Sequence, residues 1–175
     1  HLEDFRDQGE AFRMPSQVYA STAGRMELQS VVGDPEYWET GHLTRSVVKL
    51  DWNADGRQDL VATDLLAPAV LLENRTDPCG HYLQLELVGT TCERDAIGVI
   101  VTVTTDRNHE WLTWVPTGDG TMAKTQPLGH FVMGSDQSID RLHLKWPDGQ
   151  EQSWTDVPTD SRLLVIQGKS EYHVR

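Results

Sequence analysis

The sequence predicts an all-β protein, in which a small blade-like antiparallel β-meander precedes a β-sandwich or barrel. Three observations support this fold class. Short alternating or β-branched apolar runs recur along the chain, turn-forming residues cluster between them, and no segment has a convincing helical period. The 175 residues are enough to bury a core, as one ordinary domain or two small ones.

Composition narrows the class of protein. Charged residues make up 24% of the chain and hydrophobic residues 38%, which is typical of a soluble globular protein. The net charge of -12 argues against nucleic acid as a partner and is compatible with binding cations. No apolar run approaches the roughly 18 residues of a membrane span, so we expect no membrane insertion. Because the sequence begins at His1 without Met, we expect a mature or excised piece of a longer protein.

The first part of the chain is predicted to form short strands. Residues 1–15 are irregular, with a short helix or a strap left open. A hairpin is expected around Gly24, which supplies a positive φ, and 33–41 is rich in turn residues and predicts a loop. Strands are predicted at 17–20, 26–30, 46–50, 60–65 and 69–72.

The most specific chemical signal is DWNADGRQD at residues 51–59. Oxygen-bearing side chains occupy positions 1, 3, 5 and 9 of this run, and Gly56 at position 6 allows the backbone to turn sharply beneath them. Position 7 would contribute its backbone carbonyl. Hard cations such as Ca²⁺ take six to eight oxygen ligands. The predicted Ca²⁺ ligands are Asp51, Asn53, Asp55, Arg57 (through its carbonyl) and Asp59.

The flanks decide the kind of site. An EF-hand requires a Glu at position 12 and a helix on each side, whereas position 12 here is Ala62 and both flanks predict strands. The sequence therefore predicts a strand–loop–strand cation site. The alternative is an acidic turn that binds nothing, since Asp, Asn and Gly all favour turns. Asp64 would either add a ligand or only cap the turn.

After Asn74 the pattern changes to longer alternating strands. The PDG turn at residues 147–149 is a strong hairpin signal. Trp111 and Trp114 are three residues apart on one predicted strand, so one should fill the core while the other is exposed or covered. Tyr37 and Trp38 are better candidates for a contact surface. The predicted strands are 82–88, 98–104, 110–115, 129–133, 139–146, 150–154 and 162–166.

Motifs for catalysis are absent: the sequence contains no G-x-S-x-G, H-E-x-x-H, P-loop or G-x-G-x-x-G. We therefore predict that the protein is not an enzyme. Each histidine stands alone, although His130 and His143 lie on neighbouring predicted strands and could meet. Asp119 and Asp136, in separate turns, form a weaker alternative for a second cation site. The strand predicted between Cys79 and Cys92 holds its ends too far apart for a disulfide, so pairing would require the segment after Val88 to fold back along that strand.

The segment from about residue 16 to 76 resembles an FG-GAP/VCBS-type repeat, whose hallmark is a DxDxDGxxD loop followed by an LLxN ending. Here the loop is 51–59 and the ending is LLEN at 71–74. The resemblance implies that this loop binds Ca²⁺. Asn53 replaces a common Asp, which costs one charge. Such repeats usually occur in sets of several, and only one is found here.

Residues 80–170 resemble the ASPIC/UnbV domain, which follows FG-GAP-type repeats in the cartilage acidic protein-like family. The matching stretches are HYLQLELVG at 81–89, RDAIG at 94–98, HFVMG at 130–134 and the run from 139 to 149 that includes WPDG. The family implies a secreted or cell-surface protein with a role in adhesion or scaffolding.

The predicted function is therefore a non-catalytic, calcium-binding extracellular adhesion or scaffolding module. Its expected partners are a protein or glycan surface ligand, or copies of itself. Two alternatives stay open: an accessory domain of a larger secreted enzyme, and a self-assembling subunit of a fibre or surface layer.

Overall fold

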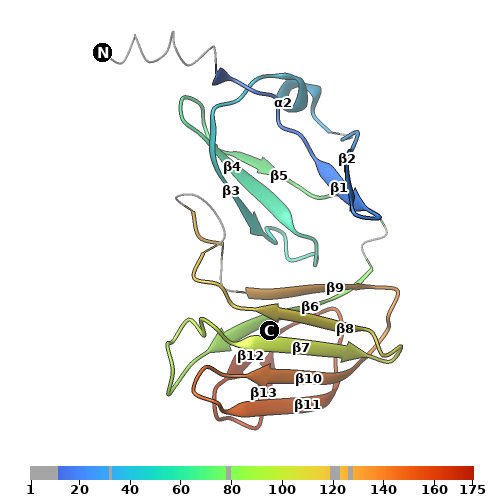
Figure 1. The fold of residues 1–175 in the computed structure, drawn as a ribbon, viewed down its shortest axis with the longest axis vertical. Helices are drawn as coiled ribbons and strands as arrows, with labels where there is room; N and C mark the ends of the chain where they lie inside the picture. The colour runs from blue at the N-terminus through green and yellow to red at the C-terminus, as the bar shows by residue number, and fades with distance from the viewer. Residues whose placement is uncertain (1–11, 32, 78–79, 119–122, 126–127) are drawn as a thin grey trace. The chain divides into compact units, whose positions relative to one another are not determined.

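The computed structural model describes residues 12–31, 33–77, 80–118, 123–125 and 128–175 (Figure 1). The all-β prediction is confirmed, since 49% of the residues are in strands and 4% in helix. Within the described ranges, no helix is long and apolar enough to cross a membrane. The chain forms two compact units, one of residues up to Val47 with Ala62–Val70, the other of Val48–Val61 with Leu71–Arg175. The predicted domains 16–76 and 80–170 stay a prediction.

The first unit begins with the expected hairpin. Strands β1 (Tyr19–Thr22) and β2 (Arg25–Leu28) pair antiparallel. Ala23 and Gly24 form the two-residue turn, with φ of 50° and 78°. This left-handed conformation is the one favoured for tight hairpins.

The expected loop at 33–41 contains a short helix, α2 (Pro35–Glu39), which corrects the prediction. Asp34 caps it by accepting a hydrogen bond from the Glu36 backbone N–H at 3.0 Å, and Pro35 suits the first turn. Tyr37 and Trp38 contact each other edge to face, with ring centroids 5.2 Å apart. A helix of five residues is too short to produce a visible period in the sequence.

A three-stranded sheet follows, in the order β3 (Thr44–Leu50), β4 (Asp59–Asp64) and β5 (Val70–Leu72). All three strands were expected, with boundaries shifted by one or two residues. The 51–59 loop joins β3 to β4, so the predicted strand–loop–strand arrangement is confirmed.

Two four-stranded sheets form the rest of the second unit. One has the order β13-β12-β6-β9 and the other β11-β10-β7-β8. The first sheet consists of β6 (His81–Val88), β9 (Leu128–Gly134), β12 (Ser161–Ile166) and β13 (Tyr172–Val174). The second consists of β7 (Ile100–Thr105), β8 (Glu110–Trp114), β10 (Ile139–Lys145) and β11 (Glu151–Val157).

The two sheets share one apolar core, so the fold of this part is a sandwich. Strict alternation places Leu83, Leu85 and Leu87 of β6 in the core. The facing sheet contributes Val101 and Val103 of β7, with others from β10. Most neighbours are antiparallel, but β6 and β12 run parallel, with Leu85 opposite Leu163. Strand β13 was not predicted because its three residues lack a pattern of their own.

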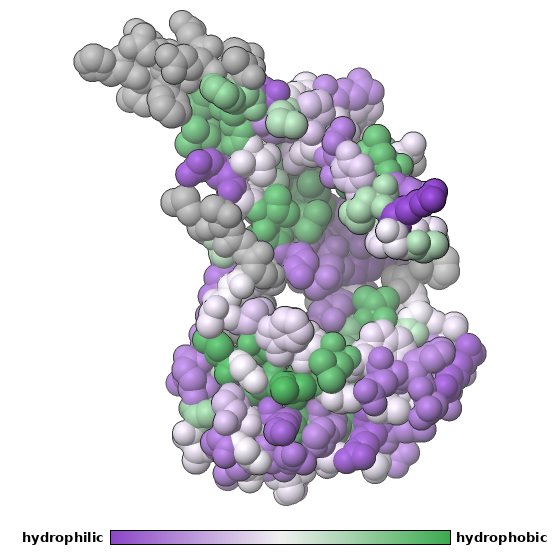
Figure 2. Space-filling view, viewed as in Figure 1, coloured by the Kyte–Doolittle hydropathy of each residue, from purple (hydrophilic) through white to green (hydrophobic). Residues whose placement is uncertain are grey.

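The tryptophan prediction for β8 is confirmed. Trp111 is half-buried against the core, whereas Trp114 is 63% exposed on the outer face of the same strand. Trp114 lies opposite Ile100 of β7, which is also exposed. Apolar residues are interspersed with polar ones on the surface shown in Figure 2.

The first unit has little core. Of its described residues, Ala62 is the one buried hydrophobic residue, at 5% exposure. Many large apolar side chains of this unit are instead at the surface. They are Phe12, Met14, Val18, Tyr19, Met26, Leu28, Val31, Val47, Leu65 and Leu66.

Candidate metal site

The 51–59 loop turns sharply through two residues with positive φ, Ala54 at 58° and Gly56 at 82°. Gly56 is buried, and a Cβ built on it would overlap the ring of Tyr82 on β6. Glycine is therefore required here both for its conformation and for the close approach of the backbone to Tyr82.

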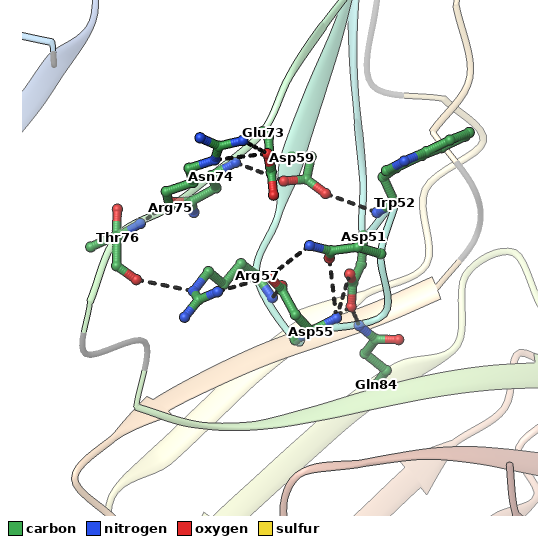
Figure 3. A network of polar contacts seen from close by, with 12 residues as sticks. Asp51, Trp52, Asp55, Arg57, Asp59, Glu73, Asn74, Arg75, Thr76 and Gln84 are labelled. Carbon is green, nitrogen blue, oxygen red and sulfur yellow. Dashed lines mark hydrogen bonds and ion pairs between the residues drawn. The ribbon is translucent and has the colours of Figure 1, made fainter. Parts of the chain in front are cut away.

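Asp51, at position 1 of the loop, is turned back over the loop backbone (Figure 3). Its Oδ1 accepts the Asp55 N–H at 3.0 Å, and its Oδ2 accepts the Gly56 N–H at 2.9 Å. The same Oδ2 accepts a hydrogen bond from the side-chain amide of Gln84, at 2.6 Å. These bonds fix a carboxylate on the inner side of the turn.

Asp55, at position 5, is linked to two other predicted ligands. Its Oδ1 accepts the Arg57 N–H at 2.9 Å, and its Oδ2 accepts from Asn53 Nδ2 at 2.9 Å and from Arg57 Nη1 at 2.8 Å. Hydrogen bonding from the Arg57 backbone is the main cause that lowers the pKa of Asp55 from its usual range. Asp55 is therefore ionised at neutral pH, with a guanidinium as its counterion.

Asp59, at position 9, has a different environment. Its side chain is fully buried, its Oδ2 accepts the Trp52 N–H at 2.8 Å, and its Oδ1 accepts the Asn74 N–H at 2.7 Å. Asp59 thus ties the start of the loop to the segment after β5. This contact also gives the LLEN ending a structural role, because Asn74 closes the bridge (Figure 3).

The predicted ligands of the 51–59 loop carry the chemical groups that a hard cation prefers. All the predicted donors are oxygens, and Asp51, Asn53 and Asp55 lie within one hydrogen-bonded turn. The Arg57 guanidinium already places a positive charge against Asp55. In this arrangement, however, no group of three or more His, Cys, Asp or Glu side chains among the described residues is placed to hold a metal ion. Asp59 is instead directed to the backbone N–H groups of Trp52 and Asn74.

Asp64 caps a turn. Its Oδ2 accepts the Leu43 N–H at 2.8 Å, and its Oδ1 accepts the N–H groups of Leu66 and Ala67 at 2.7 and 3.0 Å. Of the two alternatives that the sequence left open, the structure shows the cap.

The weaker second cation site depends on Asp119 and Asp136. Asp119 lies outside the described residues. Asp136 is buried and accepts hydrogen bonds from Thr105 Oγ1 at 2.6 Å and His109 Nδ1 at 2.8 Å. The hydrogen bond from Thr105 is the main cause that lowers the pKa of Asp136. Asp136 therefore braces the β9–β10 turn against the β7–β8 hairpin.

Two carboxylate–histidine pairs had no signal in the sequence. His109 pairs with Asp136, and His81 Nδ1 lies 2.7 Å from Asp160 Oδ2, although 79 positions separate them. His130 and His143 lie on strands that follow one another in the chain, β9 and β10, and these two strands belong to different sheets. Burial lowers the pKa of His130.

Of the two cysteines, Cys79 lies outside the described residues. Cys92 is half-buried, and its Sγ lies 3.2 Å from Gln167 Oε1. Burial raises the pKa of the Cys92 thiol, so the thiolate is disfavoured. The Cys79–Cys92 pairing that the sequence left open falls on a residue outside the described ranges.

Comparison with known proteins identifies part of the chain. No curated protein matches it. A protein-family match described as ASPIC and UnbV covers residues 89–172. The matched range includes β7 to β12 but begins after β6, although β6 lies between β12 and β9 in the first sheet of the sandwich. Residues 89–172 are therefore an ASPIC/UnbV domain, and β6 completes its sandwich.

Proposed function

We propose that the 51–59 loop holds a calcium ion and that the protein is a non-catalytic, extracellular module for adhesion or scaffolding. The observation that carries the proposal is the turn in which Asp51, Asn53 and Asp55 share hydrogen bonds around a buried Gly56. Converging oxygen groups on a tight turn are what Ca²⁺ requires.

The ligands in this proposal are the Asp51 and Asp55 carboxylates, the Asn53 amide oxygen and the Arg57 carbonyl. Asp59 either joins them or braces the loop through Trp52 and Asn74. A bound ion supplies positive charge that offsets the repulsion among the loop carboxylates. Because the Arg57 guanidinium lies 2.8 Å from Asp55 Oδ2, ion binding at Asp55 would compete with this contact.

The proposed assignment of residues 16–76 to an FG-GAP/VCBS-type repeat has separate support. The loop sits between two strands of a small three-stranded sheet, and Asn74 of the LLEN ending is bonded to Asp59 of the loop. The extracellular location and the adhesive role rest on the resemblance to this repeat and on the ASPIC/UnbV domain that follows it.

A calorimetric calcium titration of EDTA-treated protein, with melting curves at zero and saturating Ca²⁺, tests the ion site. We expect heat of binding to one site and a higher melting temperature. A hundredfold excess of ion over the dissociation constant corresponds to about 2.7 kcal/mol of stabilisation. Asp55→Ala should abolish most of the shift, while Asp140→Ala, at an exposed aspartate of β10, should retain it. Absence of heat in the wild type would contradict the proposal.

A second candidate, self-association through the first unit, is favoured by its many exposed apolar side chains, since a large exposed apolar surface commonly marks an interaction site. Sedimentation velocity over a range of concentrations tests it. We expect the average mass to rise with concentration and Met26→Lys with Leu28→Lys to suppress the rise. A monomer at all concentrations would contradict this candidate.

A further inference from the structure

Gln84 has an unusual environment for its place in the sandwich. Leu83 and Leu85 point into the core, so Gln84 points to the opposite face of the sheet. A polar residue on an outer face is normally solvated, yet Gln84 is only 5% exposed. Something must cover it.

The cover is the 51–59 loop. Gln84 Nε2 donates to Asp51 Oδ2 at 2.6 Å, and Gly56 lies against the ring of Tyr82, two residues earlier on β6. All of these residues belong to the second compact unit. A short, partly buried hydrogen bond from an amide to a carboxylate is among the stronger hydrogen bonds in proteins.

Neighbouring strands complete the contact. His130 on β9 and Arg162 on β12 lie opposite Gln84 on its two sides. Asp51, Gln84, His130 and Arg162 all line one small cavity of about 30 Å³. The shared lining places the loop beside this face of the sheet.

We infer that Gln84 locks the loop to the ASPIC/UnbV sandwich, so that an ion held in the loop also stabilises the sandwich. Gln84 acts as a positioning residue: it orients the Asp51 carboxylate, as groups outside the ligand shell commonly do at metal sites. The part that concerns the ion rests on the proposed calcium site, whereas the lock itself depends only on the contacts above.

Hydrogen exchange measured by mass spectrometry tests both parts on the intact chain. In EDTA, Gln84→Met should speed exchange in β6 and β9 about tenfold, as expected for the loss of a hydrogen bond to a charged group. In an Asp51→Ala background the same change should have little further effect. The control Gln137→Met, at an exposed glutamine in the β9–β10 turn, should leave β6 and β9 unchanged.

The second part of the experiment repeats the hydrogen-exchange measurement with calcium added. In the wild type, Ca²⁺ should slow exchange in β6 and β9 as well as in the loop, and Gln84→Met should confine the protection to the loop. Protection of the loop alone in the wild type would overturn the coupling while leaving the calcium site standing. No protection anywhere would overturn the calcium site and the coupling to the ion. Equal effects of Gln84→Met with and without Asp51 would overturn the lock.

Discussion

The N-terminal unit and the β-sandwich use apolar residues in opposite ways. Alternating strands of the sandwich bury a continuous core that includes Leu85, Leu142 and Trp146. In the N-terminal unit, among the residues that the structure describes, only Ala62 is a buried hydrophobic residue. Burial of apolar surface is the main source of folding free energy. The sandwich therefore has a large core to stabilise it, whereas the N-terminal unit depends on turns, caps and strand pairing, and by our second proposal on a partner.

A pair of leucine truncations tests this difference in core burial and has the largest expected effect. Leu85→Ala in the sandwich core should lower the free energy of unfolding by about 2–5 kcal/mol, because it leaves a cavity among packed side chains. Leu28→Ala in β2, where the side chain is exposed, should change it by no more than about 0.5 kcal/mol. Urea denaturation measures both. Similar losses in the two variants would show that the N-terminal unit has a core of its own.

A pair of glycines gives a smaller effect. Gly24 and Gly56 have nearly the same φ, 78° and 82°, but a Cβ at Gly24 meets open space while one at Gly56 overlaps Tyr82. Gly24→Ala should cost about 1 kcal/mol from the left-handed backbone alone. Gly56→Ala should cost about 2–4 kcal/mol, because steric overlap is added. Thermal melts measure the difference.

The control for the glycine pair is Tyr82→Ala. If overlap with the ring is the cause, Gly56→Ala should be less costly in the Tyr82→Ala background than in the wild type. An equal cost in both backgrounds would show that the loop does not pack on β6.

The smallest expected effect concerns pH. The pKa of Asp136 is lowered in the folded sandwich, chiefly by the hydrogen bond from Thr105. A carboxylate whose pKa is lower in the folded state than in the unfolded state stabilises the fold. This stabilisation is present above the unfolded pKa, about 3.9, and is lost as the pH falls through the folded pKa. The wild type should therefore lose more stability below about pH 4 than Asp136→Asn does. Urea midpoints at pH 5 and pH 3 measure this loss, and Asp140→Asn should behave like the wild type.

The long strands of the sandwich could be predicted from the local alternation of apolar and polar residues. Alternation located every long strand of the sandwich within a few residues, because one buried face imposes a period of two. The same rule placed Trp111 and Trp114 on opposite faces of one strand, and the structure shows that Trp111 is the one directed to the core. Helix α2 and strand β13 escaped prediction because elements of five and three residues are too short to show a period.

One part of the candidate site could be predicted from local sequence, and another part could not. Spacing within nine residues was enough to predict a turn carrying Asp51, Asn53 and Asp55, since its hydrogen bonds are local. The contact of Asp59 with Asn74, 15 positions away, has no such pattern. Gln84, 33 positions from Asp51, looked like an ordinary outward residue of a strand.

By itself, then, the sequence determined the all-β class, the longer strands and the acidic loop, because each depends on the chemistry of neighbouring residues. Only the tertiary structure decided the parallel pairing of β6 with β12, the burial of Asp59 and the bond between Gln84 and Asp51. These contacts join residues that are distant in the chain. Their partners are selected by how the sheets pack and which side chains are thereby shielded from water, and no local period records that choice.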